Sequence, residues 1–205
     1  MNPVLIAFVG VLVLPLFVAS WRLRLIGLAL QGLLMGWISY DLDPALDSYG
    51  AWLAMIDLVL VRGLVAPFAL YTVLRSHRTT ARHDLIPPNL MTWSLAIALL
   101  IVAFRFADLL VPVEGNEHSF VAGATAGVLL GFLMLATQTG PLSQMMGALR
   151  IENGIAMLEL GGHSDIAMQI AQTVILIATI LLFRWYLKTL PRASTVKVSA
   201  VEGSV

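Results

Sequence analysis

The chain has 205 residues, of which 59% are hydrophobic and 12% are charged, and its mean hydropathy is +0.90. An ordinary soluble domain carries about 25% charged residues, so a soluble fold would have too few polar side chains to cover its surface. Net charge is zero, which gives no overall field for nucleic acid. Absence of cysteine excludes disulfides, thiolate-bound iron–sulfur clusters and a cysteine nucleophile. The composition predicts an all-α integral membrane protein.

Seven apolar stretches reach or approach the roughly 20 residues that a helical bilayer span needs. In chain order they cover residues 3–20, 23–40, 51–75, 89–112, 119–137, 142–161 and 165–187. Arg150, Glu152 and Glu159 interrupt the sixth stretch. Six spans, with this stretch lying in the membrane interface, are therefore the main alternative. We treat residues 1–190 as one transmembrane domain and residues 191–205 as a disordered cytoplasmic tail.

The charge of the connections alternates along the chain. The first and third connections and the tail are basic, and the second and fourth are acidic. We expect the chain in a cell's inner (plasma) membrane. Because short basic loops remain in the cytoplasm, seven spans place the N-terminus outside the cell membrane and the C-terminus in the cytoplasm. Adding or removing one span before the tail would break this alternation. In the fifth span, Gly123, Gly127 and Gly131 predict close approach to a neighbouring helix.

Two acid–base pairs fall inside predicted spans, where a charged side chain costs at least about 2.5–3.5 kcal/mol. Asp57 and Arg62 lie in the third span, and Arg105 and Asp108 lie in the fourth. All four are expected in the outer half or near the middle of the membrane, so the two pairs are expected to meet across a helix interface. They are either structural ion pairs or part of a charge relay.

Glu152 lies near the middle of the sixth span. Arg150 is two residues away and therefore on a different face of the helix. Glu152 needs a partner from another helix, water or a bound proton, and a carboxyl that can exist in either state suits a proton relay. The alternative is a protonated carboxyl that only hydrogen-bonds a neighbouring helix. Asn153 would orient rather than carry protons, since an amide does not titrate. Glu159 lies two turns further on, and Gln31 lies near the middle of the second span.

Histidines are poor candidates for metal or haem ligands in this chain. They fall in predicted loops or at span ends, at His77, His83, His118 and His163. His77 and His83 are six residues apart, which is unfavourable spacing for a zinc site. We expect no metal and no cofactor.

The sixth span contains a distinctive motif, Gln144-Met-Met-Gly147-Ala-Leu-Arg150-Ile-Glu152-Asn153-Gly154-Ile155. This motif resembles the hydrogenase-4 component E (HyfE-like) family, which supplies membrane subunits to complex I-like, group 4 NiFe hydrogenase assemblies of the formate hydrogenlyase type. Arg62-Gly-Leu-Val-Ala-Pro67 also looks like that family's third-helix pattern, although Lys is more usual at the position of Arg62.

That family is in turn similar to NuoK-type subunits of complex I and MrpC-type subunits of cation/proton antiporters. These have three helices with a Glu in the middle one, so the last three spans would be NuoK-like and Glu152 would match that Glu. NuoK-type subunits carry a second Glu in their last helix. Here the stretch from Ile166 to Phe183 has no acid and only Gln169 and Gln172 as amides, so a second relay carboxylate must come from elsewhere.

The resemblance implies a non-catalytic subunit of an oxidoreductase complex that contributes a carboxylate to proton (or ion) translocation. Implied partners are antiporter-like (NuoL/M/N-type) and NuoH-type membrane subunits and peripheral hydrogenase subunits, in lipid and without nucleic acid. Glu152 would be the central group of this path, whose other members are Asn153, Asp57, Arg62, Arg105, Asp108, Glu159 and Gln31. A subunit of a cation/proton antiporter is the alternative function. A stand-alone small transporter is disfavoured, because broken helices in matched halves are lacking.

Overall fold

A computed structural model describes residues 3–18, 20–76, 90–111, 116–138, 140–161 and 166–189. These residues form helices and no strands. The helices are α1 (Pro3–Phe17), α2 (Trp21–Leu42), α3 (Tyr49–Met55), η1 (Ile56–Val65), α4 (Ala66–Ser76), α6 (Leu90–Leu110), α7 (Asn116–Thr137), α8 (Pro141–Gly161) and α9 (Ile166–Thr189). Because α3, η1 and α4 follow one another without a break, the described residues make seven helical rods.

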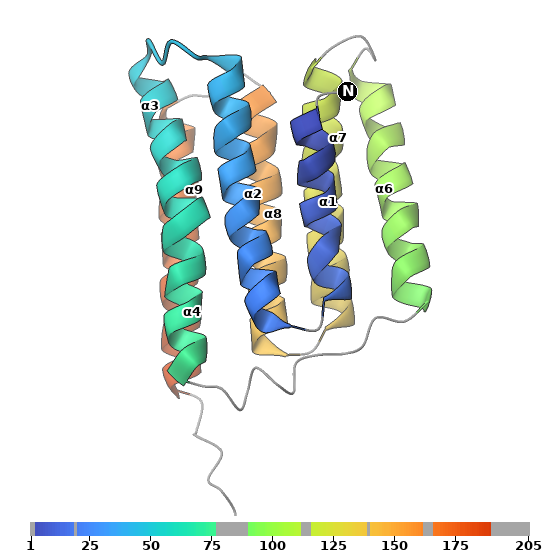
Figure 1. The fold of residues 1–205 in the computed structure, drawn as a ribbon, viewed down its shortest axis with the longest axis vertical. Helices are drawn as coiled ribbons and strands as arrows, with labels where there is room; N and C mark the ends of the chain where they lie inside the picture. Colours follow the sequence, from blue (N-terminus) through green and yellow to red (C-terminus); the bar gives the residue numbers. More distant parts are fainter. Residues whose placement is uncertain are drawn as a thin grey trace, which may run out of the picture.

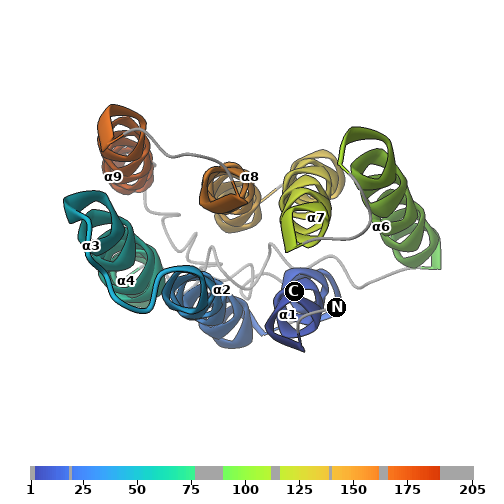
Figure 2. The same ribbon diagram turned by 90° about the horizontal axis from the view of Figure 1, so that it is seen from above.

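The rods run up and down alternately (Figure 1). Seen from above, α3 and α4, α2 and α1 form one row, and α9, α8, α7 and α6 form a second row facing it (Figure 2). Helix α8 therefore lies opposite α2, and α6 lies at the far end of its row from α9. In this arrangement, residues from four different rods can meet between α2, η1, α8 and α9.

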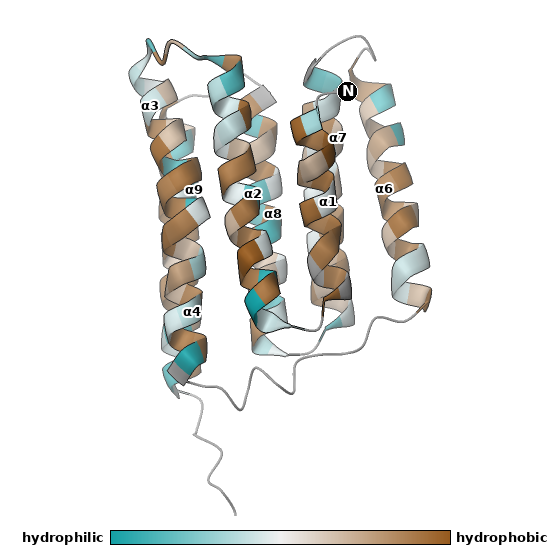
Figure 3. Ribbon diagram, in the orientation of Figure 1, coloured by the Kyte–Doolittle hydropathy of each residue, from teal (hydrophilic) through white to brown (hydrophobic). Residues whose placement is uncertain are grey.

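Five of the rods are long and apolar enough to cross a membrane: α2, the α3–α4 rod, α6, α7 and α9. Helix α1 is apolar but shorter, and α8 is interrupted by charged residues (Figure 3). Large apolar side chains such as Leu90 and Leu109 of α6 are exposed on the outside, as expected for contact with lipid. The prediction of an all-α, multi-pass membrane protein is confirmed, and the predicted span ends agree with the rods to within three residues.

Glycines allow the closest helix contacts. A Cβ atom built at Gly127 of α7 would lie 3.3 Å from the Cα of Gly154 in α8, and one built at Gly131 would lie 2.9 Å from the carbonyl oxygen of Gly147. The close approach predicted for the fifth span is therefore confirmed. A second contact of this kind joins α2 to η1, where a Cβ at Gly32 would lie 2.5 Å from the backbone nitrogen of Gly63.

Candidate functional site

The site begins with an ion pair inside η1. This segment is a π-helix of ten residues, in which each turn closes between residues i and i+5. Asp57 and Arg62 are five residues apart and therefore lie one above the other, with Arg62 Nε donating to Asp57 Oδ2 at 2.7 Å. Side-chain exposure is 1% for Arg62 and 14% for Asp57, so the charges neutralise each other largely away from solvent.

Arg62 extends this pair into α8 and α2. Its Nη1 donates to Asn153 Oδ1 at 3.1 Å, and Asn153 Nδ2 donates to Gln31 Oε1 at 3.4 Å. Gly32, next to Gln31, is the residue that lets α2 approach η1 at this level. A buried polar chain therefore links three helices in the middle of the bundle.

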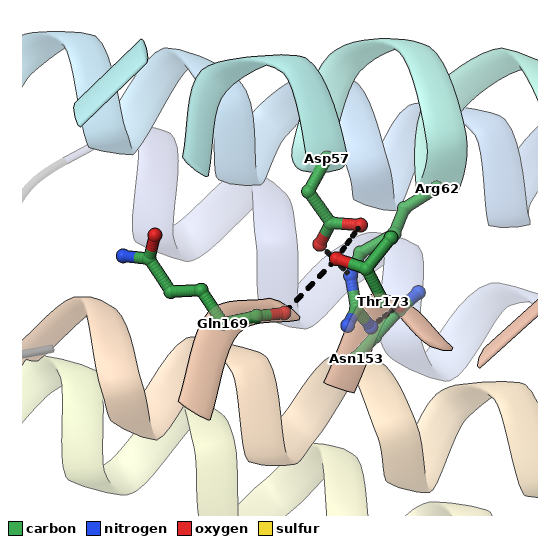
Figure 4. A network of polar contacts seen from close by, with 5 residues as sticks. All are labelled: Asp57, Arg62, Asn153, Gln169 and Thr173. Atoms are coloured by element: carbon green, nitrogen blue, oxygen red, sulfur yellow. Dashed lines mark hydrogen bonds and ion pairs between the residues drawn. The ribbon is translucent and has the colours of Figure 1, made fainter. Parts of the chain in front are cut away.

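Helix α9 contacts the other side of Asp57 through Thr173 (Figure 4). The Thr173 hydroxyl lies 2.9 Å from Asp57 Oδ1 and 3.0 Å from the carbonyl oxygen of Gln169. A hydroxyl has one hydrogen, so donation to Asp57 competes with donation to the helix backbone. We call Gln31, Asp57, Arg62, Asn153 and Thr173 the polar network.

A cavity of about 360 Å³ borders this network on the side of the α2–α3 connection. Its rim includes Asp43 and Ser48 from that connection, and its inner wall includes Asp57, Glu159 and Gln172. Two buried polar atoms of the inner wall, Glu159 Oε1 and Gln172 Nε2, make no hydrogen bond to protein. A space of this size with several polar groups in its wall can hold waters, so Asp57 can be reached from one end of the bundle.

Glu152 is half-buried on α8 and forms no hydrogen bond or ion pair with a described residue. Arg62 is the cation whose charge acts on it, and the same guanidinium acts on Glu159. Of the three partners expected for Glu152, which were another helix, water or a bound proton, the described residues supply no direct contact from another helix, and Arg62 acts on it only at longer range. Arg62 thus lies within electrostatic reach of Asp57, Glu152 and Glu159.

Arg105 and Asp108 lie apart from this network. Their side chains are 3.6 Å apart on α6, and that of Arg105 is 80% exposed. Asp108 also lies 2.8 Å from His118 Nε2 of α7. Because α6 and η1 lie at opposite ends of the two rows (Figure 2), the expectation that the two acid–base pairs meet across one interface is wrong.

The structure adds polar residues that sequence reasoning did not select. Thr173 carries no charge and could be found only by noticing that it lies one turn from Gln169 on α9. Arg24 lies inside α2 and is 1% exposed. Arg150 is equally buried. The signal for both was their position inside otherwise apolar stretches.

In the described part of the chain, no three His, Asp or Glu side chains cluster as a metal site would require. His77, His83 and His163 lie outside the described residues. No family model, no curated protein and no solved structure matches the chain. The fold and the site therefore define its class on their own, as a multi-pass helical membrane protein with a buried polar network.

Proposed function

We propose that this chain is a non-catalytic, seven-span subunit of a group 4 hydrogenase or complex I-like assembly in the cell's inner membrane. In this function it contributes carboxylates to a proton or ion path driven by redox chemistry in partner subunits. The N-terminus lies outside the cytoplasm, and the acidic α2–α3 connection lies on the same, outer side of the membrane. The resemblance of the α8 motif to the HyfE-like family suggests the assembly.

One observation carries the proposal: the cavity beside the α2–α3 connection ends at Asp57, which belongs to a buried network that spans four helices. Intramembrane charges that face a bundle interior or a water-filled space mark ion and proton pathways. Glu159 lines the cavity, and Glu152 lies about two turns deeper, towards the N-terminus of α8. Both can gain and lose a proton, whereas Asn153 and Gln31 can only orient their neighbours.

Arg62 interacts electrostatically with each carboxyl group of the path. A proton added to Glu152 or Glu159 removes a negative charge from the surroundings of Arg62, and this strengthens the relative hold of Arg62 on Asp57. Protonation at one carboxyl is therefore coupled to charge at another, as a relay requires. Arg105 and Asp108 lie at the edge of the bundle, outside this path. They belong to the surface of α6, where a partner helix could contact them.

The partners can be identified before the path is tested. The tagged chain is purified in mild detergent, and the co-purifying chains are identified by mass spectrometry. A hydrogenase large subunit among them supports the proposal. Antiporter subunits alone would replace it by the antiporter function, and a pure monomer would remove both.

Substitution of Glu152 then tests the path. In the purified assembly reconstituted in liposomes, Glu152→Gln is expected to reduce proton uptake per turnover about tenfold or more, because an amide cannot exchange a proton. Glu117→Gln, an exposed acid at the start of α7, is the matched control and keeps wild-type pumping. A dye sensitive to internal pH reports the uptake. Wild-type pumping in Glu152→Gln, with assembly intact, would remove Glu152 from the path.

A further inference from the structure

Two arginines are buried inside the bundle without belonging to the polar network. Arg24 comes from α2 and Arg150 from α8, and each residue is 1% exposed. A buried guanidinium is costly unless an anion and hydrogen-bond acceptors compensate its charge. The surroundings of these two residues therefore indicate what this part of the protein binds.

The guanidinium of Arg24 lies among the ends of helices. Its Nε donates to the carbonyl oxygen of Val18 at 2.9 Å, just after α1. Its Nη1 donates to Gln138 Oε1 at 2.8 Å, just after α7, and to Ser143 Oγ at 3.0 Å, in the first turn of α8. These contacts place Arg24 at the level where α1 and α7 end and where α2 and α8 begin.

Arg150 has donors without acceptors. Its Nε and Nη1 atoms are buried and make no hydrogen bond. The charged group that acts on it is Arg24, which has the same sign. A second cation raises the electrostatic cost of burying the first. The unpartnered donors and the like charge together favour an anion next to Arg150.

The other described charged side chains at this end of the bundle are positive as well. Exposed cations from three rods lie there, at Arg22, Arg75, Arg184 and Lys188, whereas the described acids lie at mid-helix or at the opposite end. The N-termini of α2 and α8 point to this end as well (Figure 1). Exposed N–H groups at a helix N-terminus favour a bound anion, and the N-cap residue Ser20 of α2 makes no side-chain capping bond.

We propose that this end of the bundle binds a phosphate group between Arg24 and Arg150, which we call the arginine site. Guanidinium groups bind phosphate through paired N–H donors, and Arg150 has two donors to offer. Arg24 lies at the helix ends, at the depth of lipid headgroups, and Arg150 lies about two and a half turns further in along α8. The phosphate therefore comes either from an anionic lipid headgroup or from free phosphate. This inference does not depend on the proposed function.

The first test measures the thermal unfolding of the full chain in a neutral detergent. Phosphatidylglycerol, phosphatidylcholine and inorganic phosphate are added separately. A ligand that binds only the folded state raises the apparent Tm, here by about 5 °C at saturation. A rise with phosphatidylglycerol alone identifies a lipid headgroup, and a rise with inorganic phosphate identifies the free anion. No rise with either, or an equal rise with phosphatidylcholine, would overturn the proposal.

The second test separates the arginine site from general attraction of acidic lipids to a basic surface. Arg150→Met keeps an unbranched side chain about as long as the aliphatic part of arginine and removes a buried charge, so the variant is expected to fold, but to lose the phosphate-dependent rise in Tm. Arg75→Met removes an exposed cation at the same end and is expected to keep that rise. Native mass spectrometry should show one retained phosphate-bearing adduct in wild type and Arg75→Met, and none in Arg150→Met. An undiminished rise or adduct in Arg150→Met would overturn the arginine site.

Discussion

Arg62 is the residue that links the buried polar side chains. It donates from Nε to Asp57 and from Nη1 to Asn153, and its charge acts on Glu152 and Glu159. Arg is suited to this position because its rigid guanidinium offers several donors in fixed directions. Lysine, more usual in the family that the motif resembles, would present a point charge and could not serve both partners with the same geometry.

At the scale of residues, we predict that Asp57→Leu destabilises the protein by on the order of 3 kcal/mol, because it leaves the buried Arg62 charge uncompensated. Asp57→Leu together with Arg62→Leu is expected to recover a large part of this loss, since the double variant removes both charges. Thermal unfolding in detergent measures both effects as a double-mutant cycle. The cycle includes Arg62→Leu alone, and a double variant whose loss equals the sum of the two single losses would show that the two residues are not coupled.

The contents of the network were only partly predictable from the sequence. Charges in apolar stretches are costly, which is why Asp57, Arg62 and Glu152 were selected. The residues that link Asp57 and Arg62 to other helices are neutral, and a Thr in an apolar helix such as Thr173 has no property that distinguishes it from a packing residue. Arg105 shows the opposite error: a charge at the edge of the bundle produces the same sequence signal as a charge in its middle.

At the scale of elements, the π-helix determines which residues of η1 share a face. In an α-helix, residues five apart point about 140° away from each other, and Asp57 could not lie above Arg62. The sequence pattern shows no such change of period, because apolar residues surround both charges on every side. Asp57 and Arg62 were therefore expected as a pair within one span, but their direct contact along a single helix was not predictable.

Close packing of α2 against η1 is predicted to be essential for the network. Gly32→Leu would place side-chain atoms where the backbone of Gly63 lies, and such overpacking costs about 1–3 kcal/mol or forces the helices apart. We expect a lower Tm and a broader size-exclusion peak in detergent. Gly10→Leu on α1 is the matched control, because a Cβ at Gly10 meets nothing within 4 Å. Equal behaviour of the two variants would contradict the tight contact.

At the scale of the whole molecule, the seven rods of the described residues were predictable because polar connections separate the apolar runs of the sequence. Helix ends agree with the apolar runs to within three residues. The two-row arrangement was not predictable, because lipid-facing and bundle-facing residues in these helices are both apolar. Only glycine spacing indicated a particular helix contact, and it did so for α7.

The chain contains no cysteine, which makes its orientation directly measurable. Asp47→Cys in the α2–α3 connection and Arg75→Cys at the end of α4 place single thiols at opposite ends of the bundle, both at exposed positions. We predict that a membrane-impermeant maleimide labels Asp47→Cys in intact cells and labels Arg75→Cys only after the membrane is opened. The reverse pattern would invert the orientation, and labelling of both in intact cells would contradict the topology.

The cavity and the polar network occupy the half of the bundle next to the α2–α3 connection. Towards the other end, the helices are packed with buried apolar side chains such as Leu25, Leu70 and Met146, and the buried cations Arg150 and Arg24 lie between the network and that end. Apolar packing and fixed positive charge both oppose the entry of cations. A cell that makes this subunit ahead of its partners should therefore keep its membrane potential, and growth on over-expression should show no sign of uncoupling.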